Sequence, residues 1–80
     1  MDDELAALVL EVFQGVLAKP NISPDDDFFN LGGNSVKAVK VADQLGARLG
    51  RTISPILILL SPNARDLAIT IASTDEPGMQ

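Results

Sequence analysis

The chain has 80 residues, 46% of them hydrophobic and 4% aromatic, with a formal net charge of −5 and no Cys, His, Trp or Tyr. These numbers exclude a disulfide framework, a thiol nucleophile, a Ser-His-Asp triad and the usual thiolate and imidazole zinc ligands. The acidic charge argues against nucleic-acid binding, because affinity for phosphate backbones comes mostly from cationic side chains. What remains is one small domain that acts through a partner.

The N-terminal sequence lacks the basic start of a signal peptide, since it begins Met1-Asp2-Asp3-Glu4. The longest unbroken apolar run, from Ile56 to Leu60, falls short of the ~20 residues that a membrane span needs. We therefore expect a cytoplasmic protein without a membrane partner.

Charge is distributed unevenly along the chain. Residues 1–30 carry seven acidic residues and one basic residue, whereas residues 31–65 carry one acidic residue and five basic ones. Residues 66–80 carry three acidic residues and no basic one. The central part of this acidic chain is therefore locally basic.

The first expected element is an amphipathic helix that Pro20 ends, because a residue before proline avoids helical angles. Asp2, Asp3 and Glu4 suit the positive end of its dipole. Its apolar face, at the i, i+3, i+4 spacing of a helix, consists of Leu5, Leu8, Val9, Val12, Phe13, Val16 and Leu17.

Residues 19–34 are rich in Pro, Asn, Asp and Gly, which predicts a long ordered loop. Phe28, Phe29 and Leu31 interrupt its polarity. Loops of this length are usually functional or pinned to a core. We expect at least one of the two phenylalanines to be buried as a plug for the bundle.

The acidic run Asp25-Asp26-Asp27 is interpreted as a solvated turn and not as a calcium site. An EF-hand loop needs an oxygen ligand at its fifth position and Gly at its sixth. Counted from Asp25, those positions hold Phe29 and Asn30. We expect no metal site.

A second helix is expected from about Ser35 to Leu49, with Gly50 as its left-handed C-cap. Its buried stripe is formed by Ala38, Val41, Ala42, Leu45 and Leu49.

Residues 51–61 are compatible with a buried strand or a short helix. A short helix or tight turn opened by Pro55 is favoured, because no other segment is predicted to be a strand that could pair with it. The apolar run from Ile56 to Leu60 cannot all face inward on so short a helix, and an exposed apolar part commonly marks an interaction surface.

The last helix is expected from about Asn63 to Ala72. Two signals mark its start: Ser61 followed by Pro62, and Asn63 with Asp66 three residues later. Its apolar face is Ala64, Leu67, Ala68 and Ile71. Residues 73–80 are expected to be a frayed tail. The predicted fold class is all-α, a small antiparallel four-helix bundle with three longer helices and one short one.

The segment that carries the function runs from Asp27 to Ser35 and places a serine at the start of a helix after two glycines. Glycines let another molecule approach the backbone closely, and a helix N-terminus suits a phosphate. The chain has no His to activate Ser35, so this serine is not a self-sufficient nucleophile. Ser35 as a mere helix cap is the alternative interpretation.

The run Phe28-Phe29-Asn30-Leu31-Gly32-Gly33-Asn34-Ser35-Val36 resembles the modification motif of carrier proteins, in particular the peptidyl carrier (thiolation) domains of nonribosomal peptide synthetases. The likeness continues through residues 37–42 and resumes at residues 60–63. It covers about residues 5–72, and the order of the expected elements also fits. The resemblance implies an acyl-carrier-like fold, with residues 1–72 as the carrier domain.

The resemblance implies that Ser35 receives a 4′-phosphopantetheine arm from coenzyme A through a separate Mg-dependent phosphopantetheinyl transferase. An adenylating or acyl-transferring enzyme then loads an aminoacyl, peptidyl or acyl group on the arm as a thioester. Condensing or tailoring enzymes of secondary metabolism act on it next. The carrier is then a monomer and not an enzyme.

Three further residues are expected around the arm: Gly33, Asn34 and Lys37. Lys37 either contacts the phosphate or is an ordinary exposed residue, and Val36 lies either at the core edge or in a docking contact. The predicted docking patch consists of Val36, Ile56, Leu57 and Leu59.

The chain departs from the family pattern at Asn30, where an acid is usual, at Leu60, where an aromatic residue is common, and at Asn63, where Thr is common. Asn34 and the basic residues of the second helix favour the peptidyl type over fatty-acid carriers, and a broad-specificity transferase. An acyl carrier of a polyketide or related pathway and an unmodified helical interaction module are the alternatives. The short lead before the first helix favours a free-standing protein.

Overall fold

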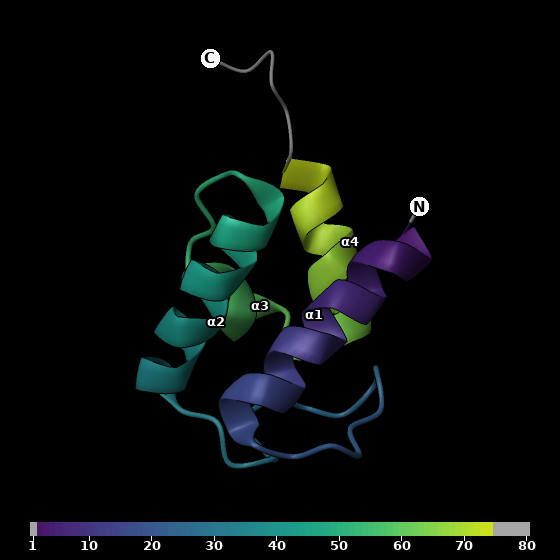
Figure 1. Cartoon of the computed structure of the whole chain (residues 1–80), viewed down its shortest axis with the longest axis vertical. Coiled ribbons are helices and arrows are strands. Elements are labelled where there is room, and N and C mark those ends of the chain that lie inside the picture. The colour runs from purple at the N-terminus through teal and green to yellow at the C-terminus, as the bar shows by residue number, and fades with distance from the viewer. Residues whose placement is uncertain (1, 75–80) are drawn as a thin grey trace.

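Helices make up all the regular secondary structure in the part of the chain that the computed structural model describes, residues 2–74. They are α1 (Asp2–Leu17), α2 (Ser35–Leu49), α3 (Ile56–Leu60) and α4 (Ala64–Thr74). Figure 1 shows that α2 and α4 run upward while α1 runs downward. The predicted all-α bundle of three longer helices and one short helix is confirmed. No described helix is both long and apolar enough to cross a membrane.

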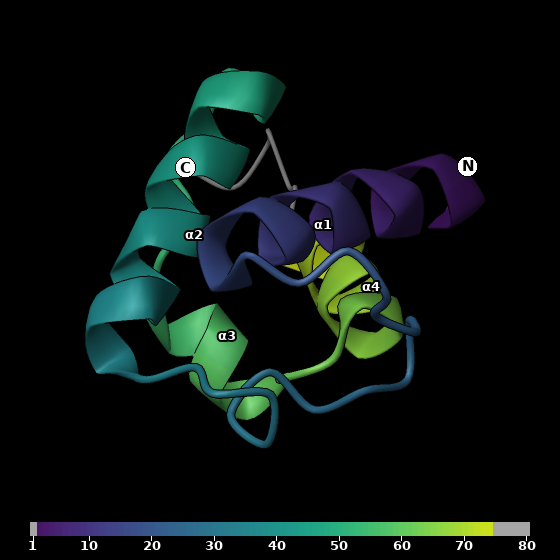
Figure 2. The same ribbon diagram turned by 60° about the horizontal axis from the view of Figure 1, so that its bottom comes forward.

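The four helices enclose one apolar core. α1 packs against both α4 and α2. The short α3 contacts α2 and α4, and it lies below α1 in Figure 2. No polar or charged residue is buried within the described range. The core consists of Val9, Val12, Phe13 and Leu17 from α1, Ala38, Val41, Ala42 and Leu45 from α2, Ile58 from α3, Ala64, Leu67, Ala68 and Ile71 from α4, and the loop residues Ile22, Phe28 and Ile53.

α1 ends at Leu17, before the position expected from Pro20. Ala18 adopts a left-handed conformation with φ of 57°, and the N–H of Lys19 donates to the carbonyl of Gln14 at 3.1 Å. This is the Schellman pattern, in which a left-handed residue satisfies a carbonyl of the last turn. The side chain of Gln14 then donates to the carbonyl of Pro20 at 3.0 Å.

The sequence predicted two signals for the start of α4, and the structure confirms only one of them. Ser61 ends α3, because its N–H donates to the carbonyl of Leu57 at 2.9 Å, so the prediction that Ser61 caps α4 is wrong. Asn63 is the cap instead, and its side-chain oxygen accepts from the N–H of Asp66 at 2.7 Å. α4 continues to Thr74, while residues 75–80 of the expected tail lie outside the described residues.

The left-handed Ala18 leads to a stability prediction. A non-glycine residue in this conformation is strained by about 1–2 kcal/mol, and glycine recovers part of that at an entropic cost in the unfolded chain. We expect Ala18→Gly to raise the free energy of unfolding by about 0.5–1 kcal/mol in urea denaturation. Gly50→Ala is the matched control at the left-handed C-cap of α2, where φ is 69°, and should lower it. A loss of stability in Ala18→Gly would contradict the assignment of strain.

Candidate functional site

Ser35 is the first residue of α2, and its hydroxyl has no structural role in the described part of the chain. The cap is its neighbour Asn34, whose backbone is extended and whose side-chain oxygen accepts from the N–H of Lys37 at 2.9 Å. Ser35 is exposed, and its side chain makes no hydrogen bond with any residue in the range 2–74. The alternative that Ser35 is only the helix cap is therefore wrong, and its hydroxyl is open to a partner.

The N-terminus of α2 is electrostatically suited to an anion on Ser35. The first turn contains no acidic residue, and a helix N-terminus carries unpaired N–H groups and a partial positive charge. Lys37 is half-buried, and its ammonium group donates to the carbonyl of Gly32 at 3.4 Å. This bond holds a positive charge beside the loop that leads into Ser35.

Phe28 anchors that loop in the core. Its side chain is fully buried, and its ring centroid lies 4.8 Å from that of Phe13. Its N–H donates to the carbonyl of Pro62 at 2.8 Å, and its carbonyl accepts from the N–H of Gly33 at 3.0 Å. The predicted buried phenylalanine is confirmed, and it fixes the backbone two residues before Ser35.

Gly33 crosses directly over this anchor. A Cβ atom at Gly33 would overlap the Phe28 ring and lie 2.7 Å from the Phe28 carbonyl oxygen. Gly32 has open space around it but adopts a φ of 103°, which side chains rarely allow. The two glycines are therefore needed for different reasons, one for close approach and the other for backbone conformation.

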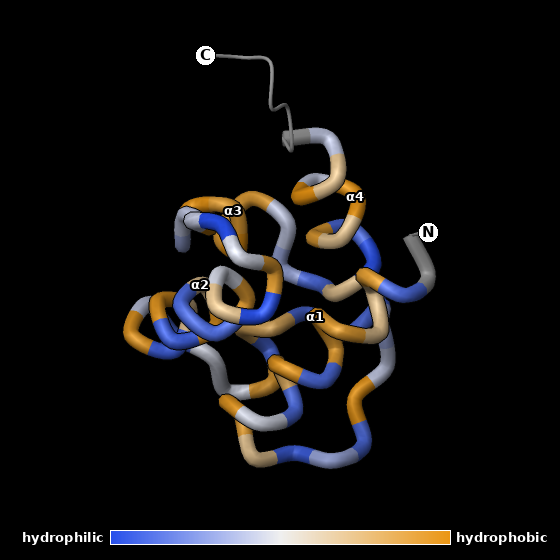
Figure 3. Tube along the Cα trace, turned by 45° about the horizontal axis from the view of Figure 1, so that its top comes forward, coloured by the Kyte–Doolittle hydropathy of each residue, from blue (hydrophilic) through white to orange (hydrophobic). Residues whose placement is uncertain are grey.

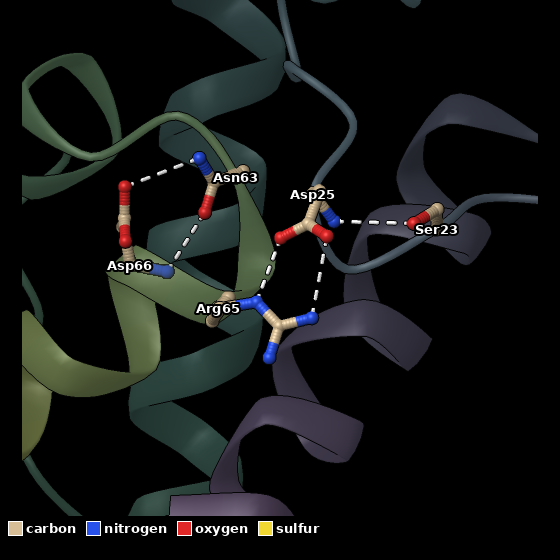
Figure 4. Close-up of polar contacts among 5 residues, drawn as sticks. All are labelled: Ser23, Asp25, Asn63, Arg65 and Asp66. Atoms are coloured by element: carbon tan, nitrogen blue, oxygen red, sulfur yellow. Dashed lines mark hydrogen bonds and ion pairs between the residues drawn. The ribbon is translucent and has the colours of Figure 1, made fainter.

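An ion pair joins the long loop to α4. The guanidinium of Arg65 donates to both carboxylate oxygens of Asp25, at 2.7 and 3.3 Å, as Figure 4 shows. The N–H of Arg65 donates to the carbonyl of Pro24 at 3.1 Å. The hydrogen bond from Arg65 lowers the pKa of Asp25 below its ordinary value. The sequence analysis missed this pair, because its members lie forty positions apart and no local pattern links them.

The other two acids of the run shape the turn locally. Asp26 accepts from the N–H of Ser23 at 2.9 Å, and Asp27 accepts from the N–H groups of Phe29 and Asn30 at 2.8 and 3.1 Å. The described residues contain no group of three or more His, Cys, Asp or Glu that could hold a metal ion. The three carboxylates are thus engaged in the turn and the ion pair.

An exposed apolar surface lies next to Ser35. We call it the α2–α3 face and define it by Val36, Val39, Ile56, Leu59 and Leu60, which are between 46% and 72% exposed. Figure 3 shows α3 coloured as hydrophobic along its length. The face contains a groove of about 210 Å³ lined by Ser35, Ala38, Val39, Pro55, Ile56 and Leu59.

The four predicted docking residues differ in their exposure to solvent. Val36, Ile56 and Leu59 are exposed on this face, whereas Leu57 is half-buried against the core and is not part of it. The sequence analysis left out Val39 and Leu60. Val39 follows Val36 by three residues, and this helical spacing was the signal that could have found it.

Comparisons with known proteins agree with this geometry. A family model described as "Phosphopantetheine attachment site" matches residues 7–71. An indigoidine synthase from Streptomyces lavendulae is 40% identical over 67 residues, which are 84% of this chain and 5% of that protein. Surfactin synthase subunit 3 from Bacillus subtilis is 27% identical over 78 residues, 98% of this chain and 6% of that protein. The chain thus corresponds to a small part of each of these long relatives.

Two solved structures share the fold. A free-standing peptidyl carrier protein from Acinetobacter baumannii aligns with a TM-score of 0.83 and 21% identity, covering 94% of this chain and 96% of that chain. BlmI, a type-II acyl-carrier-protein from Streptomyces verticillus involved in bleomycin biosynthesis, aligns with a TM-score of 0.86 and 20% identity, covering 91% of this chain and 88% of that chain.

The chain belongs to the phosphopantetheine attachment-site family, because the family model matches most of its length. The resemblance drawn from residues 28–36, the carrier function and the cofactor that it implies are thereby confirmed. The acyl-carrier-like fold is confirmed by the two structures.

The contact between Gly33 and Phe28 leads to a second prediction. Gly33→Ala forces the loop or the buried ring to shift, and overpacking of this kind typically costs about 1–3 kcal/mol. Gly15→Ala is a control in α1, where a Cβ meets nothing within 4 Å and a helical alanine is favoured by about 1 kcal/mol. Urea denaturation should show opposite signs for the two variants, and equal stability of Gly33→Ala and wild type would contradict the close contact.

The Asp25–Arg65 pair makes stability depend on pH. The pKa of Asp25 is lower in the folded protein than in the unfolded chain. The contribution of Asp25 to the free energy of unfolding is therefore complete above its pKa in the unfolded chain, and it is lost as the pH falls through its pKa in the folded protein. We expect Asp25→Asn to be less stable than wild type at about pH 7, and the difference to disappear as the pH falls through the lowered pKa of Asp25. Asp43→Asn, whose aspartate makes no ion pair among the described residues, is the control. A gap between Asp25→Asn and wild type that persists in acid would refute the ionic origin.

Proposed function

We propose that this member of the phosphopantetheine attachment-site family carries its arm on Ser35 and holds aminoacyl, peptidyl or acyl groups as thioesters for nonribosomal peptide-type biosynthesis. The observation that carries the proposal is the exposed, unbonded hydroxyl of Ser35 at the first position of α2, inside the matched range 7–71. The arm supplies the thiol that this cysteine-free chain lacks.

Attachment is a phosphoryl-transfer step in which the chain supplies only the nucleophile. The Ser35 oxygen forms a bond to the β-phosphorus of coenzyme A, the bond to the bridging oxygen breaks, and 3′,5′-ADP leaves. The hydroxyl proton goes to a base of the transferase, because this chain contains no His and Ser35 has no hydrogen-bonded base. The new phosphodiester then lies at the N-terminus of α2, where N–H groups and the helix dipole favour an anion.

The neighbours of Ser35 position it and do not react. Asn34 holds the first turn through its bond to the N–H of Lys37. Gly33 lets the loop pass over Phe28, and the Lys37 ammonium, at 3.4 Å from the Gly32 carbonyl, is within reach of the same end of the helix. In this function Lys37 offers a second positive charge to the phosphate.

The α2–α3 face is proposed as the docking surface for the enzymes that act on the arm. These are a phosphopantetheinyl transferase, an adenylating or acyl-transferring loading enzyme, and condensing or tailoring enzymes. Ser35 lines the groove of this face, so an enzyme that reaches Ser35 also meets the exposed apolar side chains around it. We further propose that the chain is a cytoplasmic monomer that performs no catalysis of its own.

The peptidyl type is favoured by the names of similar proteins, which include a nonribosomal peptide synthetase from Curvularia clavata, 36% identical over 75 residues that are 94% of this chain and 1% of that protein. A hybrid polyketide and peptide synthetase from Aspergillus candidus, 30% identical over 74 residues, keeps an acyl carrier as the second candidate. Incubating the modified protein with amino-acid-activating enzymes and, in parallel, with acyl-transferring enzymes distinguishes a peptidyl carrier from an acyl carrier.

The attachment residue is tested by the intact mass of the protein after incubation with coenzyme A, Mg²⁺ and a broad-specificity transferase. Wild type should gain one phosphopantetheinyl group and Ser35→Ala none. Ser35→Ala should keep its helical circular dichroism and lose well under the ~1 kcal/mol of a missing cap, because Asn34 caps α2. Ser73→Ala, which removes another exposed serine, should still be modified. A modified Ser35→Ala, or a folded wild type that two transferases leave unmodified, would refute the proposal.

A further inference from the structure

The N-terminus of α2 has two backbone donors without an acceptor among residues 2–74. The N–H of Ala38 donates to the carbonyl of Asn34 at 2.8 Å and begins the helical ladder. The N–H of Lys37 donates to the side-chain oxygen of Asn34 at 2.9 Å. The N–H groups of Ser35 and Val36, which also precede the ladder, make no hydrogen bond within the described range. This end of the helix is therefore only partly capped.

The same end carries no negative charge of its own. Asn34 caps it with a neutral amide, and the first turn contains no acidic residue. Along the sequence the nearest acids are Asp27 and Asp43, eight positions before and after Ser35. The ammonium group of Lys37 adds a positive charge beside the loop that enters the helix. The partial positive charge of the helix dipole therefore has no carboxylate from the adjoining chain to balance it.

An arm on Ser35 would bring the missing charge. Its phosphodiester is an anion with open acceptor oxygens, and the bond to the Ser35 side chain fixes it at the end of the helix where the two open N–H groups lie. The Ser35 hydroxyl gives up no hydrogen bond within the described chain to accept it. The unfolded chain has no helix end, so the favourable interaction exists in the folded state alone.

We propose that the phosphodiester of the arm completes the N-terminus of α2, so that attachment stabilises the folded chain, and that Asn34 is the positioning residue that permits this by capping the helix without a charge. The inference depends on the proposed function and deepens it by linking attachment to the stability of the fold. An aspartate at position 34 would cap α2 equally well. Its carboxylate, however, would balance the helix dipole before attachment and repel the phosphodiester afterwards.

The test measures how much attachment of the arm stabilises wild type, Asn34→Ser, Asn34→Asp and Gln44→Glu. Each is prepared with and without the arm, the intact mass confirms its state, and it is unfolded in urea with a thiol reductant at about 0.1 M salt. Circular dichroism gives the equilibrium constant of unfolding, and its change on attachment is the quantity compared.

Two of these variants are controls. Asn34→Ser removes the amide but keeps a neutral cap. Gln44→Glu makes the same change from amide to carboxylate at an exposed position of α2. This position is about 13 Å along the helix axis from Ser35, beyond the screening length of ~10 Å.

Attachment should lower the equilibrium constant of unfolding of wild type about two- to fivefold, the effect of a charge placed at a helix N-terminus. Asn34→Ser and Gln44→Glu should keep this gain in stability. Asn34→Asp without the arm should be at least as stable as wild type, but its gain on attachment should fall to about half or less. At about 1 M salt, where the screening length is ~3 Å, the wild-type gain should vanish.

No gain in wild type would overturn the inference, and so would an equal gain in Asn34→Asp. A gain that persists unchanged at high salt would also overturn it, because that gain would come from apolar packing of the arm and not from its charge. The salt comparison needs wild type alone, so it still decides the inference if a variant escapes modification. All these outcomes start from a modified wild type and leave the carrier function intact, whereas a folded wild type that gains no arm refutes the proposed function.

Discussion

The burial of Phe28 beneath Gly33 is the contact on which the site depends. The polar residues of a long loop stabilise it little. Burying one phenylalanine side chain is favourable by about 1.5–3 kcal/mol, so the Phe28 ring supplies this stability. The ring contacts Phe13 in the core, while the backbone of the same residue bonds both Pro62 and Gly33. A single residue thus ties the loop to α1, to the α3–α4 junction and to the backbone that enters α2.

The ion pair between Asp25 and Arg65 completes this support from the other side of the loop. Exposed ion pairs usually contribute little to stability, but this one is bidentate and is accompanied by the bond from the Arg65 N–H to the Pro24 carbonyl. The loop is therefore held at two points, before and at Phe28. A cysteine-free domain of this size has no covalent cross-link, so these contacts fix the approach of the chain to Ser35.

The helices, the buried phenylalanine and the exposed serine at the start of α2 could be predicted from the sequence, because each depends on local periodicity or on a contiguous motif. The orientation of α3 could not, because Ile56–Leu60 is apolar all round and only packing decides that Ile58 and Leu57 turn inward. α1 ends earlier than Pro20 predicts, because Ala18 adopts a left-handed conformation that an alanine in the sequence does not signal. The Asp25–Arg65 pair needed the tertiary fold, which brings distant segments together.

The division of roles around Ser35 means that the proposed modification would not weaken the fold. Asn34 shapes the site through its side-chain cap, Gly33 through close backbone approach and Phe28 through its buried ring. The Ser35 hydroxyl, in contrast, is bonded to nothing in the described chain. Attachment of a charged group there disturbs no interaction that stabilises the bundle. The exposed apolar side chains of the α2–α3 face promote association, and like charges on an acidic chain oppose contact between its copies.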